Sequence, residues 1–542
     1  MLKFARALQS VGILILLFAT WIISIYHLSV FRAPMPEHLL VRQERLNQSY
    51  FLSRQTAGVN QLVLFGDPYE RGLAAGRLTS GLMHREEDAL VAEMNKFFPN
   101  PVTRWALMVG AMRWFYGIDP YLYPWATEEM YGVAASATPD YNFLADPFTR
   151  QVAYHGVHEV GQMFVDFEKQ DFGCTFVGVP FRGSWLVGRN FDFEAVRLLD
   201  TEKIAKWIFP DTGHAYLAVT WAGMVGTVTG VNDHGVYVSI NAAGTTDFSR
   251  YGTPTTLVAL KVLQEADTAK AAVKIIEDAQ VFITDLFTVV DPAGGGFYVV
   301  EKTPQRFHTT FYAHADAVTN HLTSAEFQSD RINQFRMQEQ TTVARQNRAR
   351  ELVATWHPAI GATSATGAQA MAEILRDKRG VGGKLLHYGN RSALDALIAT
   401  HSIIYDGADQ EFWISQGPAL SGGYSGFDLR RSFQERRPVF TESLPEDMSV
   451  PPNLFVKYQT AMKALKIART ALKAGKCEVA GSNLEAIAAS PASDHYEYLM
   501  TQGDFYQACQ QNMSLAKVFW RRSLAGIPAY HKHERYLQEA LR

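Results

Sequence analysis

The sequence predicts a mixed α+β fold, and changes in its pattern along the chain are the basis for this class. Short β-rich runs separated by Gly, Asn and Asp fill the middle of the chain from Thr175 onward. Helical periodicity dominates residues 80–170 and returns after Pro452. We therefore expect a body of antiparallel strands and hairpins, preceded and followed by helices.

The composition is that of a globular chain long enough to bury its own core. Of 542 residues, 47% are hydrophobic and 19% are charged, and the formal net charge is -3. A core of this size folds without disulfide or metal cross-links. The balanced charge, and the lack of a basic stripe with interleaved aromatics, argue against a nucleic-acid partner.

The N-terminus predicts a membrane anchor within residues 1–32. Two basic residues precede an apolar run from Val11 to Tyr26, which predicts a helix over about 7–28, long enough for one bilayer crossing. No small-residue cleavage site follows, so we expect an uncleaved anchor. The basic N-terminal flank favours a single-pass membrane protein with an extracytoplasmic, periplasmic body.

Residues 33–173 form the next predicted segment, which is mostly helical. Gln61–Phe65 predicts a short strand, and Pro68 suits the first turn of the helix that follows. Gly72 and Gly76 lie four residues apart and give that helix a small face for close packing.

Residues 174–450 carry the predicted strands. Strands are expected at Thr175–Val179, Trp185–Arg189, Ala215–Thr220, Val225–Thr229, Val236–Ile240, Phe287–Asp291, Phe297–Glu301, His401–Asp406 and Gln410–Ser415. Helices are expected at Leu257–Ala279, 330–355 and 366–376.

Residues 451–542 predict a small α-helical extension. Three amphipathic helices are expected, at Tyr458–Ala474, Glu478–Ala489 and Asp504–Phe519. Their alanine-rich seams are typical of tetratricopeptide-like helix pairs, which would give a surface for a protein partner. Cys477 and Cys509 lie in this region, and we interpret them as two buried thiols, with a disulfide as the alternative in an exported protein.

The predicted chemistry lies in DFGCTFVGVPFRGSWLVGRNFDFE, residues 171–194. Cys174 opens a strand directly after Gly173, and its thiol needs a base because an ordinary thiol ionises only near ~8.5. Cleavage between Gly173 and Cys174 would supply one, since the new α-amine has a pKa of roughly 7.7–8.0. His155 or His158 is the alternative base, in a conventional cysteine hydrolase that needs no cleavage.

Further residues of this segment support the hypothesis of cleavage between Gly173 and Cys174. A hairpin would bring Asp192 beside Cys174, where a carboxylate can hold the new ammonium group, and Arg189 could hold the aspartate or a substrate oxygen. Glycine at position 173 tolerates the distorted backbone that an N-to-S acyl shift requires.

GCT followed by GRNFD resembles the N-terminal-nucleophile (Ntn) cysteine hydrolases of the choloylglycine hydrolase and acid ceramidase superfamily. Within it the chain is most similar to the acyl-CoA:6-aminopenicillanic acid acyltransferase branch. The other matching motifs are GDPYERGLAAG (66–76), GVNDHGVYVSINAAG (230–244), VTNH (318–321), SDR (329–331) and HSIIYDGADQEFWIS (401–415). The likeness spans about residues 61–430.

The resemblance implies a four-layer αββα sandwich and a self-cleaving zymogen whose propeptide stays bound as a subunit. It implies a role for each matching residue: Cys174 as nucleophile with its amine as base, Arg189 and Asp192 orienting amine and substrate, Asn241 donating to the oxyanion, and Asn320 and Arg331 completing the polar floor. Such oxyanion donors matter because removing one costs about 10²–10³-fold in rate.

We therefore predict a hydrolase or acyltransferase that acts on linear N-acyl amide bonds through an acyl-enzyme at Cys174. A small N-acyl amide, including a lipid-like one, is the expected substrate, and no cofactor or metal is expected. HGVHE (155–159) has two histidines three apart, an order that fits no standard zinc motif. The alternative from another class is a membrane-tethered, non-catalytic scaffold with an uncleaved body, whose C-terminal helices bind a partner.

Overall fold

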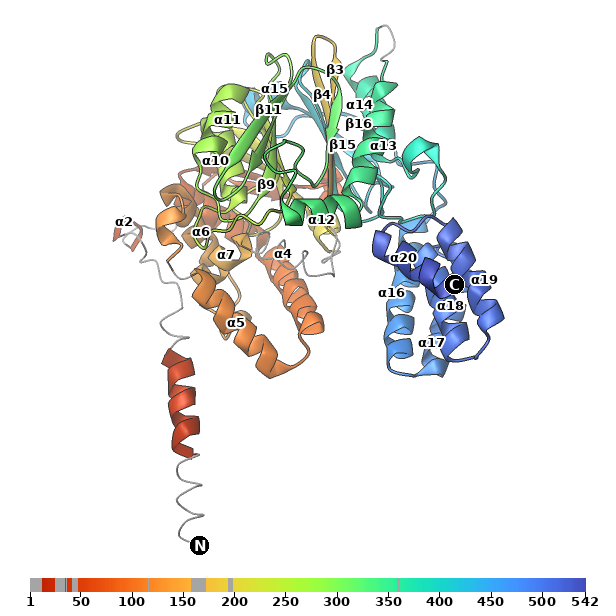
Figure 1. Ribbon diagram of the computed structural model, residues 1–542. Helices are drawn as coiled ribbons and strands as arrows, with labels where there is room; N and C mark the ends of the chain where they lie inside the picture. Colours follow the sequence, from red (N-terminus) through yellow and green to blue (C-terminus); the bar gives the residue numbers. More distant parts are fainter. Residues whose placement is uncertain are drawn as a thin grey trace, which may run out of the picture.

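The structure, a computed structural model, describes residues 12–24, 35, 37–40, 47–115, 117–156, 172–193, 198–357 and 361–542. Two stacked β-sheets carry helices on their outer faces, and two groups of helices extend from one side of this body (Figure 1). The predicted α+β class is confirmed.

The larger sheet has nine strands in the order β1-β2-β5-β6-β7-β8-β9-β10-β11. Its strands are β1 (Tyr50–Leu52), β2 (Asn60–Gly66), β5 (Ile204–Pro210), β6 (Tyr216–Thr220), β7 (Thr229–Asn232), β8 (Tyr237–Ala242), β9 (Asp285–Val290), β10 (Phe297–Lys302) and β11 (Phe307–Tyr312). All neighbours are antiparallel except β2 and β5, which run parallel along the full length of β2. The segment before Cys174 therefore supplies two strands as well as helices.

The second sheet has seven antiparallel strands in the order β12-β3-β4-β13-β14-β15-β16. Its strands are β3 (Phe172–Phe181), β4 (Ser184–Phe193), β12 (Asp316–Val318), β13 (Ala399–Asp406), β14 (Glu411–Ser415), β15 (Tyr424–Asp428) and β16 (Phe440–Leu444). Arg182 and Gly183 join β3 to β4 with φ of 52° and 81°. Positive φ at both central residues is typical of the two-residue turn whose twist matches a hairpin.

Three buried layers hold the body together. The layer between the sheets is rich in aromatics such as Trp207 of β5 and Phe176 of β3. The outer face of the nine-stranded sheet packs against helices before and after the strands, including Met130 and Leu260. The outer face of the seven-stranded sheet packs against two further helices through residues such as Met371. Side chains alternate between these layers because successive strand residues point to opposite faces.

The helices are those that cover the sheets and those that extend from them. They are α2 (Glu37–Leu40), α3 (Arg54–Ala57), α4 (Pro68–Phe97), α5 (Pro101–Phe115), α6 (Pro124–Ala134), α7 (Pro147–His155), α9 (Leu198–Glu202), α10 (Thr255–Glu265), α11 (Ala269–Asp278), α12 (Arg331–Glu339), α13 (Thr342–Ala354), α14 (Ser364–Leu375), α15 (Leu429–Glu435), α16 (Leu454–Lys473), α17 (Cys477–Ala488), α18 (Tyr496–Ala508), α19 (Met513–Ala525) and α20 (His531–Leu541), with short 3-10 turns at Asp119–Tyr121, Pro139–Tyr141 and Val381–Gly383.

Several local predictions were wrong. The helix expected over 330–355 is two helices, α12 and α13, and the helix expected over Asp504–Phe519 spans the break between α18 and α19. The single helix expected over Leu257–Ala279 is two helices, because Thr268 caps a new start by accepting a hydrogen bond from the backbone of Ala271. The run Val225–Thr229 belongs to β7 only at its last residue. The amides of Val225 and the residue after it donate to His155 instead of to a neighbouring strand.

The C-terminal helices form two antiparallel pairs, α16 with α17 and α18 with α19, followed by α20 (Figure 1). Leu454 and Tyr458 of α16 are buried in one cluster with Leu397 of the body, which fixes the extension to the sheets. Cys477 and Cys509 form a disulfide, so the interpretation of two free thiols was wrong. Cys477 is the first residue of α17, and Cys509 directly follows the last residue of α18. The pairing of the helices brings these two helix ends together.

The predicted membrane anchor lies only partly within the described residues. Residues 12–24 are helical, whereas 7–11 and 25–28 lie outside the described part of the chain. In the part that is described, none of the helices combines the length and the hydropathy needed to cross a membrane.

Candidate active site

Cys174 lies near the start of β3, between the stacked sheets. In the hairpin it pairs with Phe191, while Gly173 pairs with Asp192. The thiol is 0% exposed and packs with Phe191 and Trp221. Asp192 is thus offset by one residue from the predicted position and lies opposite the glycine.

Two side chains hold the backbone of Cys174. Its amide N–H donates to Asn320 Oδ1 at 2.8 Å, and its carbonyl oxygen accepts from Arg345 Nη1 at 2.7 Å. Arg345 Nη2 donates to the same Asn320 oxygen at 2.8 Å, which closes a ring of three groups. β3 runs without a break through the Gly173–Cys174 bond, so this ring grips the uncut chain.

Asn320 is itself fixed from both sides. Its Nδ2 donates to the carbonyl of Ala242 at 2.9 Å, just where β8 ends. Its backbone N–H donates to Thr342 Oγ1 at 2.8 Å, at the start of α13. The Thr-Asn motif therefore joins the two sheets and α13 at the predicted nucleophile.

Asp192 carries a buried carboxylate beside Gly173. A Cβ at position 173 would lie 3.1 Å from Asp192 Oδ2, a tight contact, and 3.6 Å from Arg345 Cζ, an ordinary one, so glycine gives the Asp192 carboxylate the most room here. Neither carboxylate oxygen has a hydrogen-bond partner among the described residues. Burial raises the pKa of Asp192 to about 7, although the Arg345 guanidinium lowers it. An unsatisfied buried carboxylate is costly and calls for a partner.

Arg189 and Asn241 lie behind Cys174, the predicted nucleophile. Arg189 is fully buried and donates from its guanidinium to the carbonyls of Val228, at 2.9 Å, and Ile240. Asn241 Nδ2 donates to the carbonyls of residues 318 and 319 at 3.2 and 3.1 Å, and its oxygen accepts from Arg189 Nε at 3.4 Å. Both amide hydrogens of Asn241 are therefore already donated in the uncut chain.

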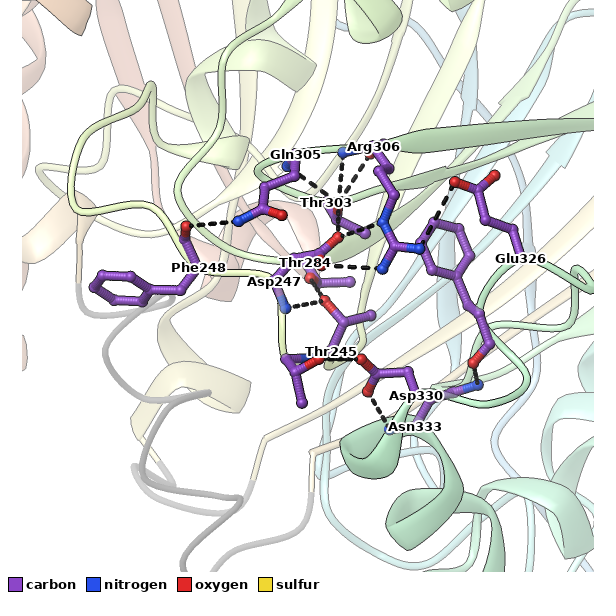
Figure 2. A network of polar contacts seen from close by, with 12 residues as sticks. Thr245, Asp247, Phe248, Thr284, Thr303, Gln305, Arg306, Glu326, Asp330 and Asn333 are labelled. Carbon is purple, nitrogen blue, oxygen red and sulfur yellow. Dashed lines mark hydrogen bonds and ion pairs between the residues drawn. The ribbon is translucent and has the colours of Figure 1, made fainter.

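The structure does not bring Arg331 to this cluster. Arg331 is the first residue of α12, and its side chain is exposed. The neighbouring Asp330 caps the helix by accepting from the amides of residues 332 and 333 and also binds Thr246 at 2.8 Å (Figure 2). The SDR motif thus contributes Asp330 to the polar network of Figure 2. In the same network Arg306 binds Asp247 through two nitrogens and fixes the loop after β8.

Arg345 occupies the place predicted for Arg331. It is 2% exposed and comes from α13, one helix later in the chain. Sequence reasoning missed it because it lies on an arginine-rich helix without a local motif. The signal available in the sequence was the short separation along the chain between Arg345 and the Thr-Asn pair. The helix that carries Arg345 begins at Thr342, and Thr342 binds Asn320.

Burial raises the pKa of the Cys174 thiol, while Arg189 and Arg345 lower it and Asp192 raises it. No nearby histidine among the described residues is placed as its base. His155 Nδ1 contacts the carbonyl of Gln151 at 2.7 Å, and Nε2 accepts from the Val225 amide at 2.8 Å, so both ring nitrogens are engaged. Burial lowers the pKa of His155 to about 4. His158, the other predicted candidate, lies outside the described residues.

His401 is a neighbour of the site that sequence reasoning missed. Its ring stacks on Phe191 with the centroids 5.1 Å apart, and its Nε2 lies 3.0 Å from Thr229 Oγ1. Burial lowers its pKa well below the ordinary value, with Arg189 adding to the effect. The ring is therefore neutral and fills the space behind the hairpin.

An apolar cavity of about 140 Å³ adjoins the cluster of side chains that packs on Cys174. Phe191, Trp221 and Val228 line it and also pack on Cys174. The opposite wall comes from α4, α7 and residues 137–138, all of which precede the expected cut. Glu86 and Glu87 are both buried acidic groups of this wall, and burial raises the pKa of Glu86 well above the ordinary value.

One group of side chains within the described residues has metal-ligand spacing. His214, Asp233 and His234 gather at the turn between β7 and β8. Both histidines also approach carboxylates, with His214 Nε2 3.0 Å from Asp267. This group contains none of the residues of the predicted active site.

Residues 182–418 match the model of the acyl-coenzyme A:6-aminopenicillanic acid acyl-transferase family, which confirms the resemblance over this segment. The match begins after Cys174 and includes Arg189, Asp192, Asn241 and Asn320. None of the curated proteins matches the chain.

Solved structures are similar to part of the chain, each at low sequence identity. A Caenorhabditis elegans N-acylethanolamine-hydrolyzing acid amidase ortholog is 17% identical over 44% of this chain and 96% of its own, with a TM-score of 0.31. A single-residue variant of conjugated bile acid hydrolase from Clostridium perfringens is 11% identical over 52% and 99%, with a TM-score of 0.29. A second mutant of that hydrolase is 10% identical over 50% and 96%, with a TM-score of 0.27.

Proposed function

We propose that this protein, whose central segment matches the acyltransferase family, is a self-cleaving Ntn cysteine hydrolase or acyltransferase with an αββα body. It would cut itself between Gly173 and Cys174 and then use Cys174 on linear N-acyl amides. The observation that carries the proposal is the set of groups around that bond. Asn320 accepts from the Cys174 amide and Arg345 donates to its carbonyl. The carboxylate of Asp192, which has no hydrogen-bond partner in the described part of the chain, belongs to the residue opposite Gly173.

The self-cleavage step would be an N-to-S acyl shift. The Cys174 sulfur attacks the carbonyl carbon of Gly173, the C–N bond breaks, and the thiol proton passes to the departing nitrogen. Water then cleaves the thioester, which releases a carboxylate at Gly173 and a free amine and thiol at Cys174. The close approach of Asp192 and Arg345 to position 173 restricts the peptide before the cut.

After cleavage the new amine would act as the base. Asn320 Oδ1 already accepts from this nitrogen, and Asp192 is the nearby anion that can hold an ammonium group. An α-amine with a pKa of roughly 7.7–8.0 can take the thiol proton near neutral pH. The Asp192 carboxylate, which has no hydrogen-bond partner among the described residues, would thereby gain one.

The reaction with substrate would repeat the same bond changes on an external amide. The thiolate attacks the acyl carbon, the amine of the substrate leaves with a proton, and an acyl-thioester remains at Cys174. Water or an acceptor amine then takes the acyl group. Asn241 is the proposed oxyanion donor, and for this one of its hydrogen bonds to Val318 or Thr319 must be released.

The cavity beside Cys174 bears on the acyl group. An apolar cavity of about 150 Å³ holds one benzene molecule, and the cavity here is of similar size, about 140 Å³. We therefore propose an acyl group of roughly six carbons or a single aromatic ring. A long-chain acyl group would have to extend beyond this cavity.

The proposed location is an anchored, extracytoplasmic one. The apolar run at residues 11–26 supports an anchor. The disulfide between Cys477 and Cys509 supports an oxidising compartment, because disulfides rarely persist in the cytosol.

Intact mass and N-terminal sequencing of the purified protein test the proposal. Wild type is expected to separate on denaturation into residues 1–173 and 174–542, and Cys174→Ala to stay whole. A Cys477→Ser/Cys509→Ser variant is the matched control, since it removes the other two cysteines and should still cut. A single uncut chain in wild type would overturn the proposal and favour the scaffold. Activity without a cut would favour a conventional cysteine hydrolase.

A further inference from the structure

Three connections meet at one end of the nine-stranded sheet. They are the turn from β5 to β6, which carries His214, the turn from β7 to β8, which carries Asp233 and His234, and the link from α10 to α11, which carries Asp267. The four side chains contact one another, and the centroids of the two imidazole rings are 4.2 Å apart. These residue types supply nitrogen and oxygen ligands to a divalent cation.

The backbones that carry these side chains are fixed to one another by hydrogen bonds. Asn232 is buried, and its Nδ2 donates to the carbonyl of Ala266 at 2.8 Å while its Oδ1 accepts from the amide of His234 at 3.1 Å. The amide of His214 donates to the carbonyl of Gln264 at 3.0 Å. The three connections are therefore held in place by the protein itself, and the cluster is preorganised.

The cluster has the separations of a metal site on the side of Asp233. Asp233 Oδ1 lies 3.4 Å from His214 Nδ1 and 3.0 Å from His234 Nδ1. The other oxygen of Asp233 accepts from the Ala215 amide at 3.1 Å, which leaves Oδ1 for the rings. Ligands of a tetrahedral Zn²⁺, at about 2.0–2.2 Å from the ion, lie about 3.4 Å from one another. The two measured separations therefore fit two edges of such a tetrahedron.

Asp267 approaches the other nitrogen of both rings. Its Oδ1 lies 3.0 Å from His214 Nε2 and 3.6 Å from His234 Nε2. A histidine that ligates a metal usually donates the N–H of its second ring nitrogen to a carboxylate or carbonyl, which fixes the tautomer. With the proton on Nε2, Nδ1 of both rings is an acceptor beside the Asp233 oxygen, and three acceptors require a cation between them. Protons could replace that cation only by making two charged rings 4.2 Å apart, which repel each other.

The cluster lies far from the predicted nucleophile. β8 begins at Tyr237, three residues after His234, and ends at Ala242, whose carbonyl accepts from the Asn320 side chain that also binds Cys174. Five residue steps of a strand span about 17 Å. An ion bound at the cluster would therefore join the three connections and would not touch the bond that reacts.

We propose that His214, His234 and Asp233 bind one Zn²⁺, with Asp267 as the carboxylate that orients both rings. Two imidazole nitrogens favour zinc over Mg²⁺ and Ca²⁺, which take oxygen ligands. The bound ion stabilises this end of the nine-stranded sheet. The site does not depend on the proposed function.

Zinc uptake by the full-length chain tests the site. The measurements are made in Cys174→Ala, because the other two cysteines form a disulfide and no thiol is then left to bind zinc. Metal-free protein is titrated with ZnCl₂ by calorimetry, and thermal unfolding is followed with and without zinc. His214→Gln/His234→Gln removes two ligands, and His308→Gln/His314→Gln changes two exposed histidines outside the cluster.

One Zn²⁺ per chain is expected, and zinc at 100 times its Kd should shift the unfolding equilibrium about 100-fold toward the folded chain. The ligand variant should lose both effects, and the control pair should keep them. Asp267→Asn should weaken zinc binding by about tenfold, because it removes only the orienting carboxylate. Absence of zinc uptake, uptake that survives in the ligand variant, or equally tight binding of Mg²⁺ would overturn the assignment. A ligand variant that loses the same stability with and without zinc would identify a cluster of ion pairs only, and this too would overturn it.

Discussion

Asp192→Asn tests whether the ionised carboxylate beside Gly173 lowers the free energy of unfolding of the uncut chain. The change is made in Cys174→Ala, which keeps the chain whole. Burial raises the pKa of Asp192 from 3.8 to about 7 in the folded chain. The folded state therefore binds more protons than the unfolded state between pH 4 and 7, and the free energy of unfolding falls as pH rises through that window. At 1.36 kcal/mol for each tenfold change in acidity, the ionised carboxylate costs about 4 kcal/mol at pH 8.

Urea unfolding at pH 4, 6 and 8 measures this cost. Cys174→Ala/Asp192→Asn is expected to be about 4 kcal/mol more stable than Cys174→Ala at pH 8 and nearly equal to it at pH 4. The asparagine matches the protonated carboxyl in shape, so packing is common to both chains. A difference that stays the same at all three pH values would refute the reasoning, because it would reflect packing and not ionisation.

Three further predictions concern the contacts of Arg345 with Cys174 and Asn320, the cavity beside Cys174 and the C-terminal extension. Arg345→Lys removes the two-nitrogen grip on Cys174 and Asn320 and should slow self-cleavage by about 10²-fold, followed on gels over time, whereas Arg331→Lys should cut at the wild-type rate. Met224→Trp should shift the kcat/KM preference from hexanoyl toward acetyl substrates by about tenfold or more, whereas Met224→Leu should not; an unchanged preference would place the acyl group elsewhere. Cys477→Ser/Cys509→Ser should destabilise the extension by about 4 kcal/mol, because the disulfide closes a loop of about 32 residues. Limited proteolysis would show this as faster cleavage within residues 451–542. Equal protease resistance of the variant and wild type would contradict the prediction.

Much of the fold could be predicted because hairpins leave local signals. The β3–β4 hairpin was predicted from alternating β-rich runs around a glycine turn, and its turn has the expected positive φ. Its register could not be predicted to the residue, so Asp192 faces Gly173 instead of Cys174. Pairing of β2 with β5 could not be predicted at all, because the two strands are separated by more than a hundred residues.

In the candidate site, too, residues in local motifs could be predicted and residues placed by long-range packing could not. Cys174 and Asn320 stand in short motifs, and the structure joins them by a hydrogen bond. Arg345 depends on how α13 packs against the sheet, which no local pattern encodes, so a nearby arginine in a motif was predicted in its place. The disulfide likewise depends on which helices pair in the extension.

The parallel pairing of β2 with β5 has a consequence for the fate of the N-terminal fragment. Seven residues of β2 are built into the interior of the nine-stranded sheet, between β1 and β5, and Val63 and Leu64 are fully buried there. A cut at position 174 would therefore produce a nicked domain whose two pieces complement each other, not an inhibitor that diffuses away. Such a cut would make unfolding harder to reverse. Once unfolded, the two fragments would have to associate again as separate chains before the sheet could reform. Activation could then not be reversed by dissociation, and recovery after heating would depend on the concentration of the two pieces.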